Sequence, residues 1–184
     1  MNRSTIYTIV ALCVILALAA AATIFVLQKK SQQQLQSSQA GQALANSEGE
    51  EAYSSFSGEV VDLEDFLGQP MVVTSWASWV PASATELPLL AGVAQDYAPE
   101  GVVVVGINRA ENTATAQAYL ASLGVAKDVQ LIVDPKDKYY KAISGYTMPE
   151  TLIYNQAGEV VLHKRGTITR AEIDTALASI LEED

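Results

Sequence analysis

The residue types that usually carry chemistry are scarce in this chain. Its 184 residues include one cysteine, Cys13, and one histidine, His163. An internal disulfide needs two cysteines and a zinc site needs several Cys or His ligands, so neither can be assembled. Ser83 and His163 would suggest a hydrolase, but no G-x-S-x-G motif surrounds the serine, and the histidine is expected on a distant hairpin. We therefore expect no catalytic residue, no metal and no cofactor.

One stretch nevertheless has the setting of a reaction site, and it reads TSWASWVPASATELP from Thr74 to Pro88. The apolar run Met71 to Trp76 predicts a buried strand, and Pro81 marks the start of the helix that follows. The turn between them lies at the positive end of the helix dipole, which favours an ionised nucleophile. Val80 has no nucleophilic atom, however, and the Ser83 hydroxyl is scarcely ionised at neutral pH.

Strands and helices alternate around this stretch. We expect strands at Glu59–Val61, Met71–Trp76, Val102–Ile107, Gln130–Val133, Thr151–Tyr154 and Glu159–His163. We expect helices at Leu63–Leu67, Ala82–Tyr97, Thr113–Leu123, Asp137–Ile143 and Thr169–Leu181. This order predicts an α/β domain with a mixed central sheet and helices on both of its faces.

The chain from about Phe56 to Leu181 resembles the thioredoxin superfamily, and most closely the membrane-anchored thiol-disulfide proteins of the TlpA and ResA type, which adjoin the redoxin and peroxiredoxin group. WASWVPASATELP looks like the family's WASWC-x-x-C-x-x-E-x-P. Met148 to Thr151 is similar to its cis-proline loop, and Gln156 to Val160 to the hairpin that follows. The resemblance implies a thioredoxin-like fold and a thiol-disulfide or peroxide activity.

The chain departs from this family at the two motif cysteines, where it has Val80 and Ser83. The family's reaction needs a thiolate that attacks a disulfide and a second thiol that resolves the product. We therefore predict a redox-inactive domain that binds a protein or an extended peptide. The alternative is a thiol-disulfide or peroxiredoxin-type role in which a partner protein supplies the missing sulfur.

The resemblance also implies where a peptide would bind. In the family an extended peptide pairs with the backbone edge before the cis-proline, a form of β-augmentation. The candidate contact residues are Trp79, Val80 and Pro81 of the motif with Met148 and Pro149 of the loop, and a cis Met148–Pro149 bond is expected.

Other residues near these motifs receive structural interpretations. Glu86 matches the family's motif glutamate, and we interpret it as an exposed carboxylate in the first turns of the helix, where the dipole favours negative charge. Trp76 is expected in the core. Three tyrosines are expected to pack near the cis-proline loop: Tyr139, Tyr140 and Tyr146.

The N-terminal part of the chain predicts a membrane anchor. Thr5 to Leu27 contains no charged residue, and as a helix it would span roughly 34 Å, against about 30 Å of hydrocarbon core. A cleaved signal peptide is the alternative, but the apolar part of such signals is usually about 7–15 residues long. We expect a single-pass anchor over residues 1–27, with the domain outside the cytoplasm.

A Gln- and Ser-rich linker follows at residues 28–52, since so few large apolar residues cannot form a packed core. The domain is predicted over residues 53–184. All 21 Asp and Glu follow Ser47, whereas three of the 11 Lys and Arg precede it. So acidic a domain repels phosphate backbones, and we expect no nucleic-acid partner.

Overall fold

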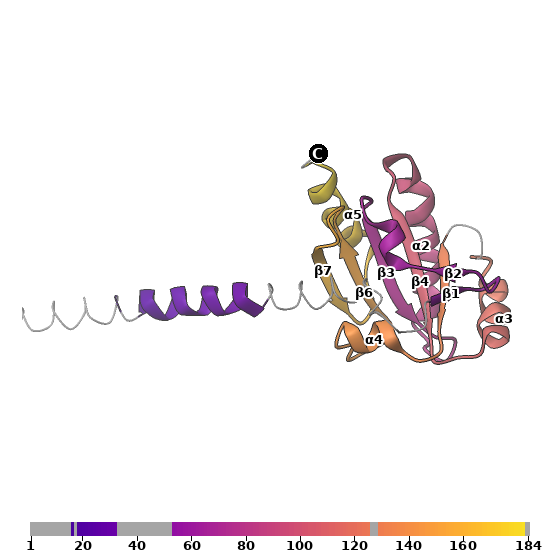
Figure 1. Ribbon diagram of the computed structural model, residues 1–184. Coiled ribbons are helices and arrows are strands. Elements are labelled where there is room, and N and C mark those ends of the chain that lie inside the picture. Colours follow the sequence, from indigo (N-terminus) through magenta and orange to yellow (C-terminus); the bar gives the residue numbers. More distant parts are fainter. Residues whose placement is uncertain (1–15, 17, 33–52, 126–128, 183–184) are drawn as a thin grey trace, which may run out of the picture. The chain divides into compact units, whose positions relative to one another are not determined.

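The computed structural model describes residues 16, 18–32, 53–125 and 129–182 (Figure 1). The chain divides into two compact units, Met1–Gln36 and Ser37–Asp184. In the first unit, residues 18–32 form a helix that continues beyond the end of the predicted anchor at Leu27. No helix within the described ranges is both long and apolar enough to cross a membrane. Most of the predicted anchor and linker lies outside the described residues.

The second unit contains a seven-stranded sheet with the order β2-β1-β5-β4-β3-β6-β7. β3, β4 and β5 are parallel, and the remaining neighbours pair antiparallel. The strands are β1 Tyr53–Ser55, β2 Val60–Val61, β3 Met71–Trp76, β4 Val103–Arg109, β5 Gln130–Asp134, β6 Glu150–Tyr154 and β7 Val160–Arg165. The mixed sheet expected from the sequence is confirmed, except that β1 was not predicted.

The helices follow the predicted order closely. They are α2 Ser83–Tyr97, α3 Thr113–Leu123, α4 Lys138–Ala142 and α5 Arg170–Leu181, with 3-10 turns η1 Leu63–Phe66 and η2 Ala98–Glu100. Local signals set their ends: the Asn112 side chain caps α3, which stops at Gly124 with φ 70°, and a capping box between Thr169 and Glu172 opens α5.

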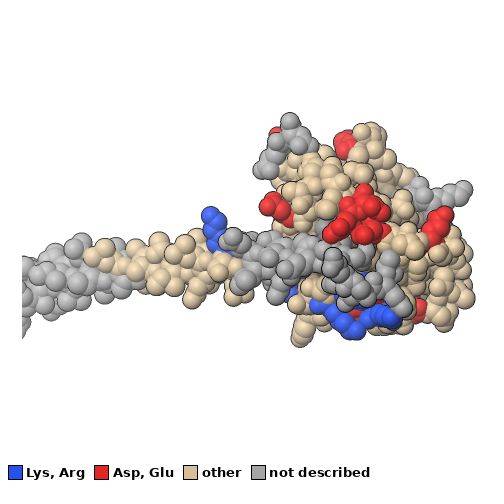
Figure 2. All heavy atoms as spheres, in the orientation of Figure 1, with Lys and Arg blue, Asp and Glu red and all other residues tan. Residues whose placement is uncertain are grey.

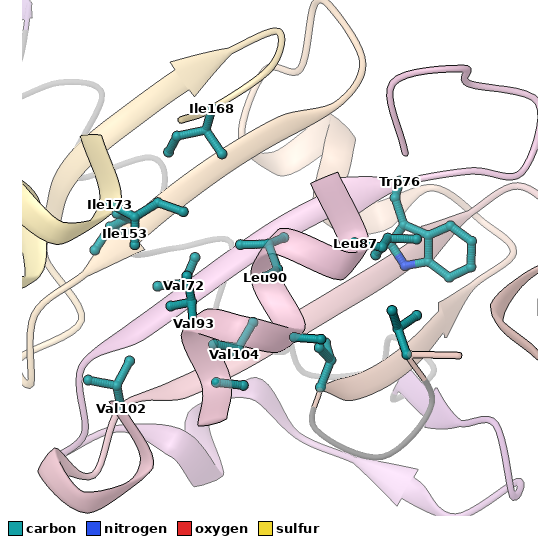
Figure 3. Close-up of a cluster of buried hydrophobic side chains, with 14 of the residues drawn as sticks. Val72, Trp76, Leu87, Leu90, Val93, Val102, Val104, Ile153, Ile168 and Ile173 are labelled. Carbon is teal, nitrogen blue, oxygen red and sulfur yellow. The ribbon is translucent and has the colours of Figure 1, made fainter. Parts of the chain in front are cut away.

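Two apolar clusters cover the two faces of the sheet. One joins Val72 of β3 to α2, α3 and α5. Figure 3 shows Leu90 of α2 and Ile173 of α5 in the same cluster as Val72. The other joins Met71 and Val73 to Leu63 of η1 and to α4. Because alternate residues of a strand point to opposite faces, β3 contributes to both clusters and all six of its residues are buried. Helical elements therefore cover both faces, as predicted.

The charged side chains are unevenly distributed on the visible face of the domain. Figure 2 shows acidic groups spread over this face and basic groups gathered at its lower edge, beside α4. Lys138 and Lys141 belong to α4, and Lys136 precedes it. The domain is acidic overall, but basic side chains gather at this edge of the visible face.

Candidate functional site

The predicted motif turn and the cis-proline loop leave the sheet at the same end. β3 and β6 are antiparallel neighbours, and their last pair toward this end is Ser75 with Glu150. The chain after β3 forms the motif turn, and the chain before β6 forms the loop. The Met148–Pro149 bond in that loop is cis, which is the geometry that the resemblance implied. The fold thus brings together two segments that lie far apart in the sequence.

The two positions that replace the motif cysteines are buried. Val80 is 5% exposed and Ser83 is fully buried. Val80 was predicted as a contact residue, and its burial leaves it little surface for that role. Among the described residues, the Ser83 hydroxyl has no hydrogen-bond partner. Trp79 and Pro81 are exposed, and Trp79 keeps 59% of its surface open.

A carboxylate that the sequence reasoning missed holds the motif turn. The Ser78 backbone N–H donates to Glu111 Oε2 (2.8 Å), and the Ser78 hydroxyl donates to Glu111 Oε1. Asn108 Nδ2 donates to the same carboxylate at 2.7 Å. Asn108 lies at the carboxyl end of β4, beside β3 in the sheet. Glu111 follows β4, which is the parallel neighbour of β3. This position was the signal that could have identified Glu111 as a residue near the motif turn.

Glu86 is not the exposed carboxylate that the sequence suggested. It is 4% exposed, because it lies on the face of α2 that packs against the sheet. Its Oε1 accepts hydrogen bonds from the hydroxyls of Thr74 (3.0 Å) and Thr151 (2.9 Å), and its Oε2 accepts one from the Ile168 backbone N–H (3.2 Å). Burial raises the pKa of Glu86, and these three hydrogen bonds offset the effect only in part.

A second buried carboxylate fixes the cis-proline loop. Glu150 Oε2 accepts hydrogen bonds from the backbone N–H groups of Tyr146 (2.9 Å) and Thr147 (3.3 Å), and its Oε1 contacts His163 and Arg165 of β7. Burial raises the pKa of Glu150, but the hydrogen bonds from His163 and from the two backbone groups outweigh it, so the pKa is lowered. His163 therefore supports this loop through Glu150.

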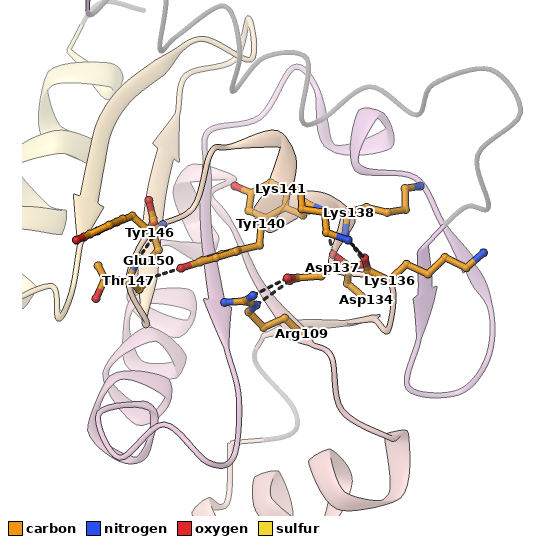
Figure 4. A network of polar contacts seen from close by, with 11 residues as sticks. Arg109, Asp134, Lys136, Asp137, Lys138, Tyr140, Lys141, Tyr146, Thr147 and Glu150 are labelled. Atoms are coloured by element: carbon orange, nitrogen blue, oxygen red, sulfur yellow. Dashed lines mark hydrogen bonds and ion pairs between the residues drawn. The ribbon is translucent and has the colours of Figure 1, made fainter.

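The other side of the same loop is held from α4. The Tyr140 hydroxyl donates to the Thr147 carbonyl at 3.1 Å. The Arg109 guanidinium lies over the Tyr140 ring, 3.4 Å from its centroid, and its Nε donates to Asp137 at 2.7 Å. Figure 4 shows this chain of contacts running from Asp137 through Arg109 and Tyr140 toward Glu150. It joins β4 and α4 to the loop.

The three tyrosines expected to pack near the loop have different environments. Tyr139 and Tyr140 are buried, so the interpretation as packing residues is confirmed for them. Tyr146 is 86% exposed, and the packing prediction is wrong for it. Its backbone N–H donates to Glu150, while its ring lies outside the core. The prediction for Trp76 is confirmed, since this residue is 1% exposed.

Met148 leaves both of its backbone polar groups unpaired within the described part of the chain. Thr147 uses its N–H for Glu150 and its carbonyl for Tyr140, and the Pro149 carbonyl accepts from Gly166 N–H. The N–H and carbonyl of Met148 have no hydrogen bond to any residue that the structure describes. An extended strand arriving at this edge would satisfy both groups.

A mixed sheet with a strand-to-helix motif turn facing a cis-proline loop defines a protein of the thioredoxin-like class. Within that class the chain belongs to the AhpC/TSA family, whose match covers residues 40–163. It is 25% identical over 116 residues to the thiol-disulfide oxidoreductase ResA of Bacillus subtilis, covering 63% of this chain and 64% of ResA. It is also 34% identical over 99 residues to the thiol:disulfide interchange protein DsbE of Allochromatium vinosum, covering 54% of this chain and 52% of DsbE.

Solved structures agree on the fold. A putative DsbE from Chlorobium tepidum matches with a TM-score of 0.64 and 25% identity, over 71% of this chain and 92% of that protein. StoA from Bacillus subtilis matches with a TM-score of 0.59 and 20% identity, over 68% of this chain and 94% of StoA. The domain is therefore a thioredoxin-like redoxin related to the ResA and DsbE thiol-disulfide oxidoreductases.

Proposed function

We propose that this domain binds an extended segment of a protein or peptide and does not itself exchange disulfides. The observation that carries the proposal is the backbone of Met148, whose N–H and carbonyl are unpaired among the described residues beside the motif turn. Trp79 and Pro81 supply exposed apolar surface at the same end of the sheet. Main-chain hydrogen bonds would give affinity and the neighbouring side chains would give specificity.

The proposal that the domain does not exchange disulfides follows from its lack of cysteine sulfur. Thiol-disulfide exchange and peroxide reduction both proceed through a thiolate, and the only cysteine of the chain is Cys13. Val80 and Ser83 are buried at the two motif positions. The motif turn can keep its structural role without sulfur, because β3, the turn and α2 also form the core.

The names of the relatives favour a second candidate, a redox role in which a partner supplies the cysteines. Activity assays of the chain alone test whether it has any redox activity of its own, and the second candidate expects activity only when a cysteine-bearing partner is added. The full chain carrying Cys13→Ser should show no dithiol-dependent insulin reduction and no thiol-dependent peroxide consumption above a buffer blank. Adding Val80→Cys and Ser83→Cys should restore a thiol at the helix start that titrates below the free-cysteine value of about 8.5. Turnover by the variant without these two cysteines would refute the non-redox proposal.

A direct test addresses the binding edge. Peptides selected by display from a random library against the full chain should slow hydrogen exchange at the Met148 amide, because that N–H gains an acceptor. The Val60 amide, on β2 at the opposite border of the sheet, serves as the control. Selected peptides that leave exchange at Met148 unchanged would place binding elsewhere and contradict the proposal.

We also propose that the chain is a single-pass membrane protein with its domain outside the cytoplasm. The uncharged run from Thr5 to Leu27 supports this placement. Alkaline extraction should leave the chain in the membrane fraction, and protease added to spheroplasts should digest the domain. Release at high pH, or a protected domain in intact spheroplasts, would contradict it.

A further inference from the structure

We propose that Tyr146 is a second aromatic contact of the binding surface and that, with Trp79, it selects a segment carrying an aromatic side chain. This inference rests on the proposed function, because it names the chemistry of the partner at the same surface. Tyr146 is 86% exposed, which is more than any other large apolar side chain of the described domain. Exposed aromatic rings are the side chains that most often dominate binding surfaces.

The sheet register brings Tyr146 and Trp79 to one end of the domain. β3 and β6 are antiparallel neighbours that separate beyond the pair Ser75 and Glu150. Trp79 follows Ser75 by as many residues as Tyr146 precedes Glu150. The two exposed rings therefore rise from neighbouring segments, and Met148, whose backbone is the proposed binding edge, belongs to the segment of Tyr146.

The backbone that carries the Tyr146 ring is held by two hydrogen bonds. Its N–H donates to Glu150, and the preceding Gly145 donates to the Tyr140 carbonyl at 2.7 Å. Gly145 also packs so tightly that a Cβ there would lie 2.4 Å from the Tyr140 ring. Ser144 has a positive φ of 54°, which directs the chain out of α4. An exposed ring on a fixed backbone loses little conformational freedom when it binds.

The carboxylates near these rings already accept hydrogen bonds. Glu111 accepts from Ser78 at the motif turn, and Glu150, at the start of β6, contacts His163 of β7. Met148 adds an apolar neighbour, since its half-buried side chain packs against a core cluster. An ammonium group entering here would lose water and would meet carboxylate oxygens that already accept hydrogen bonds. A neutral aromatic side chain would stack on the rings and bury apolar area, which identifies the partner chemistry.

The test uses the full chain and displayed random nonapeptides. Enriched peptides should share an aromatic residue, and replacing it with Ala or Lys in a synthetic peptide should weaken binding measured by fluorescence anisotropy. Tyr146→Thr should weaken binding of the aromatic peptide by about three- to tenfold, whereas Tyr146→Phe keeps the ring and should stay within about twofold. Val60→Thr, at a 78% exposed residue on β2, is the matched control and should bind like the unmodified chain.

The outcomes distinguish this inference from the proposed function. Peptides that protect the Met148 amide but show no aromatic preference, or that bind the Tyr146→Thr variant normally, would overturn the inference and leave the proposed function standing. If no selected peptide slows hydrogen exchange at the Met148 amide, both the inference and the proposed function are contradicted. A loss of affinity confined to Tyr146→Thr, with an unchanged melting temperature, would support the inference, because a merely structural residue would also lower stability.

Discussion

Replacing Glu86 tests whether a buried carboxylate holds three elements together behind the motif turn. Its two oxygens accept from Thr74 on β3, Thr151 on β6 and the Ile168 N–H before α5. Glu86→Leu keeps the volume but removes all of these acceptors. Glu86→Gln can keep most of them, because its carbonyl can accept from Ile168 while its amide donates to the two hydroxyls, which can rotate to accept.

The expected size of the effect follows from what each substitution leaves unpaired. In Glu86→Leu the two threonine hydroxyls, 2.9 Å apart, can bond to each other, which leaves the Ile168 N–H and one hydroxyl hydrogen without an acceptor. A buried unsatisfied group costs about 1–3 kcal/mol. Removing the buried carboxylate also removes its desolvation cost, which offsets part of this penalty. We therefore expect the free energy of unfolding to fall by about 2–4 kcal/mol. Glu86→Gln should change stability by less than about 1 kcal/mol at the pH where Glu86 is protonated.

The pH dependence provides an independent signature. Burial raises the pKa of Glu86 in the folded state, so the folded protein retains this proton at a pH where the unfolded chain has lost it. The free energy of unfolding therefore falls as pH rises from the unfolded value of about 4.3 through the raised pKa. Glu86→Gln lacks this titration, and its stability relative to the unmodified chain should increase over that interval.

Urea unfolding of the full chain, followed by tryptophan fluorescence, measures both effects because Trp76 is buried in the core. A Glu86→Leu variant as stable as the unmodified chain would show that the three hydrogen bonds contribute little. A stability difference between Glu86→Gln and the unmodified chain that does not change with pH would refute the reasoning on the raised pKa.

The remaining predictions concern the cis-proline loop. Gly145→Ala should lower stability by about 1–3 kcal/mol in thermal melts because its Cβ would lie 2.4 Å from the Tyr140 ring; Gly92→Ala in α2, where a Cβ meets nothing within 4 Å, is the control and should stabilise by about 0.5–1 kcal/mol. Equal melting temperatures for the two variants would contradict the close packing. The lowered pKa of Glu150 means that its contribution to stability is present above the unfolded value of about 4.3 and is lost as pH falls toward the folded pKa. Glu150→Gln should therefore be less stable than the unmodified chain at pH 7, and the gap between their melting temperatures should narrow below pH 4.

Local patterns in the sequence determined most of the fold. The apolar run of β3 and the span of α3 could be read directly because strand burial and helix ends depend on residues close in the chain. β1 escaped detection because its three residues, Tyr53–Ser55, are too few to show a period. The absence of a reactive sulfur from the motif was equally a property of the sequence alone.

The environment of each site residue was decided by the tertiary structure. Glu86 is buried because the face of α2 that carries it turns toward β3, where a threonine from β3 and one from β6 supply donors. Tyr146 is exposed, although its backbone N–H is bound by Glu150, which also contacts β7. Val80 is buried although its neighbour Trp79 is open to solvent. These outcomes depend on contacts between residues far apart in the chain, which local propensity and spacing do not encode.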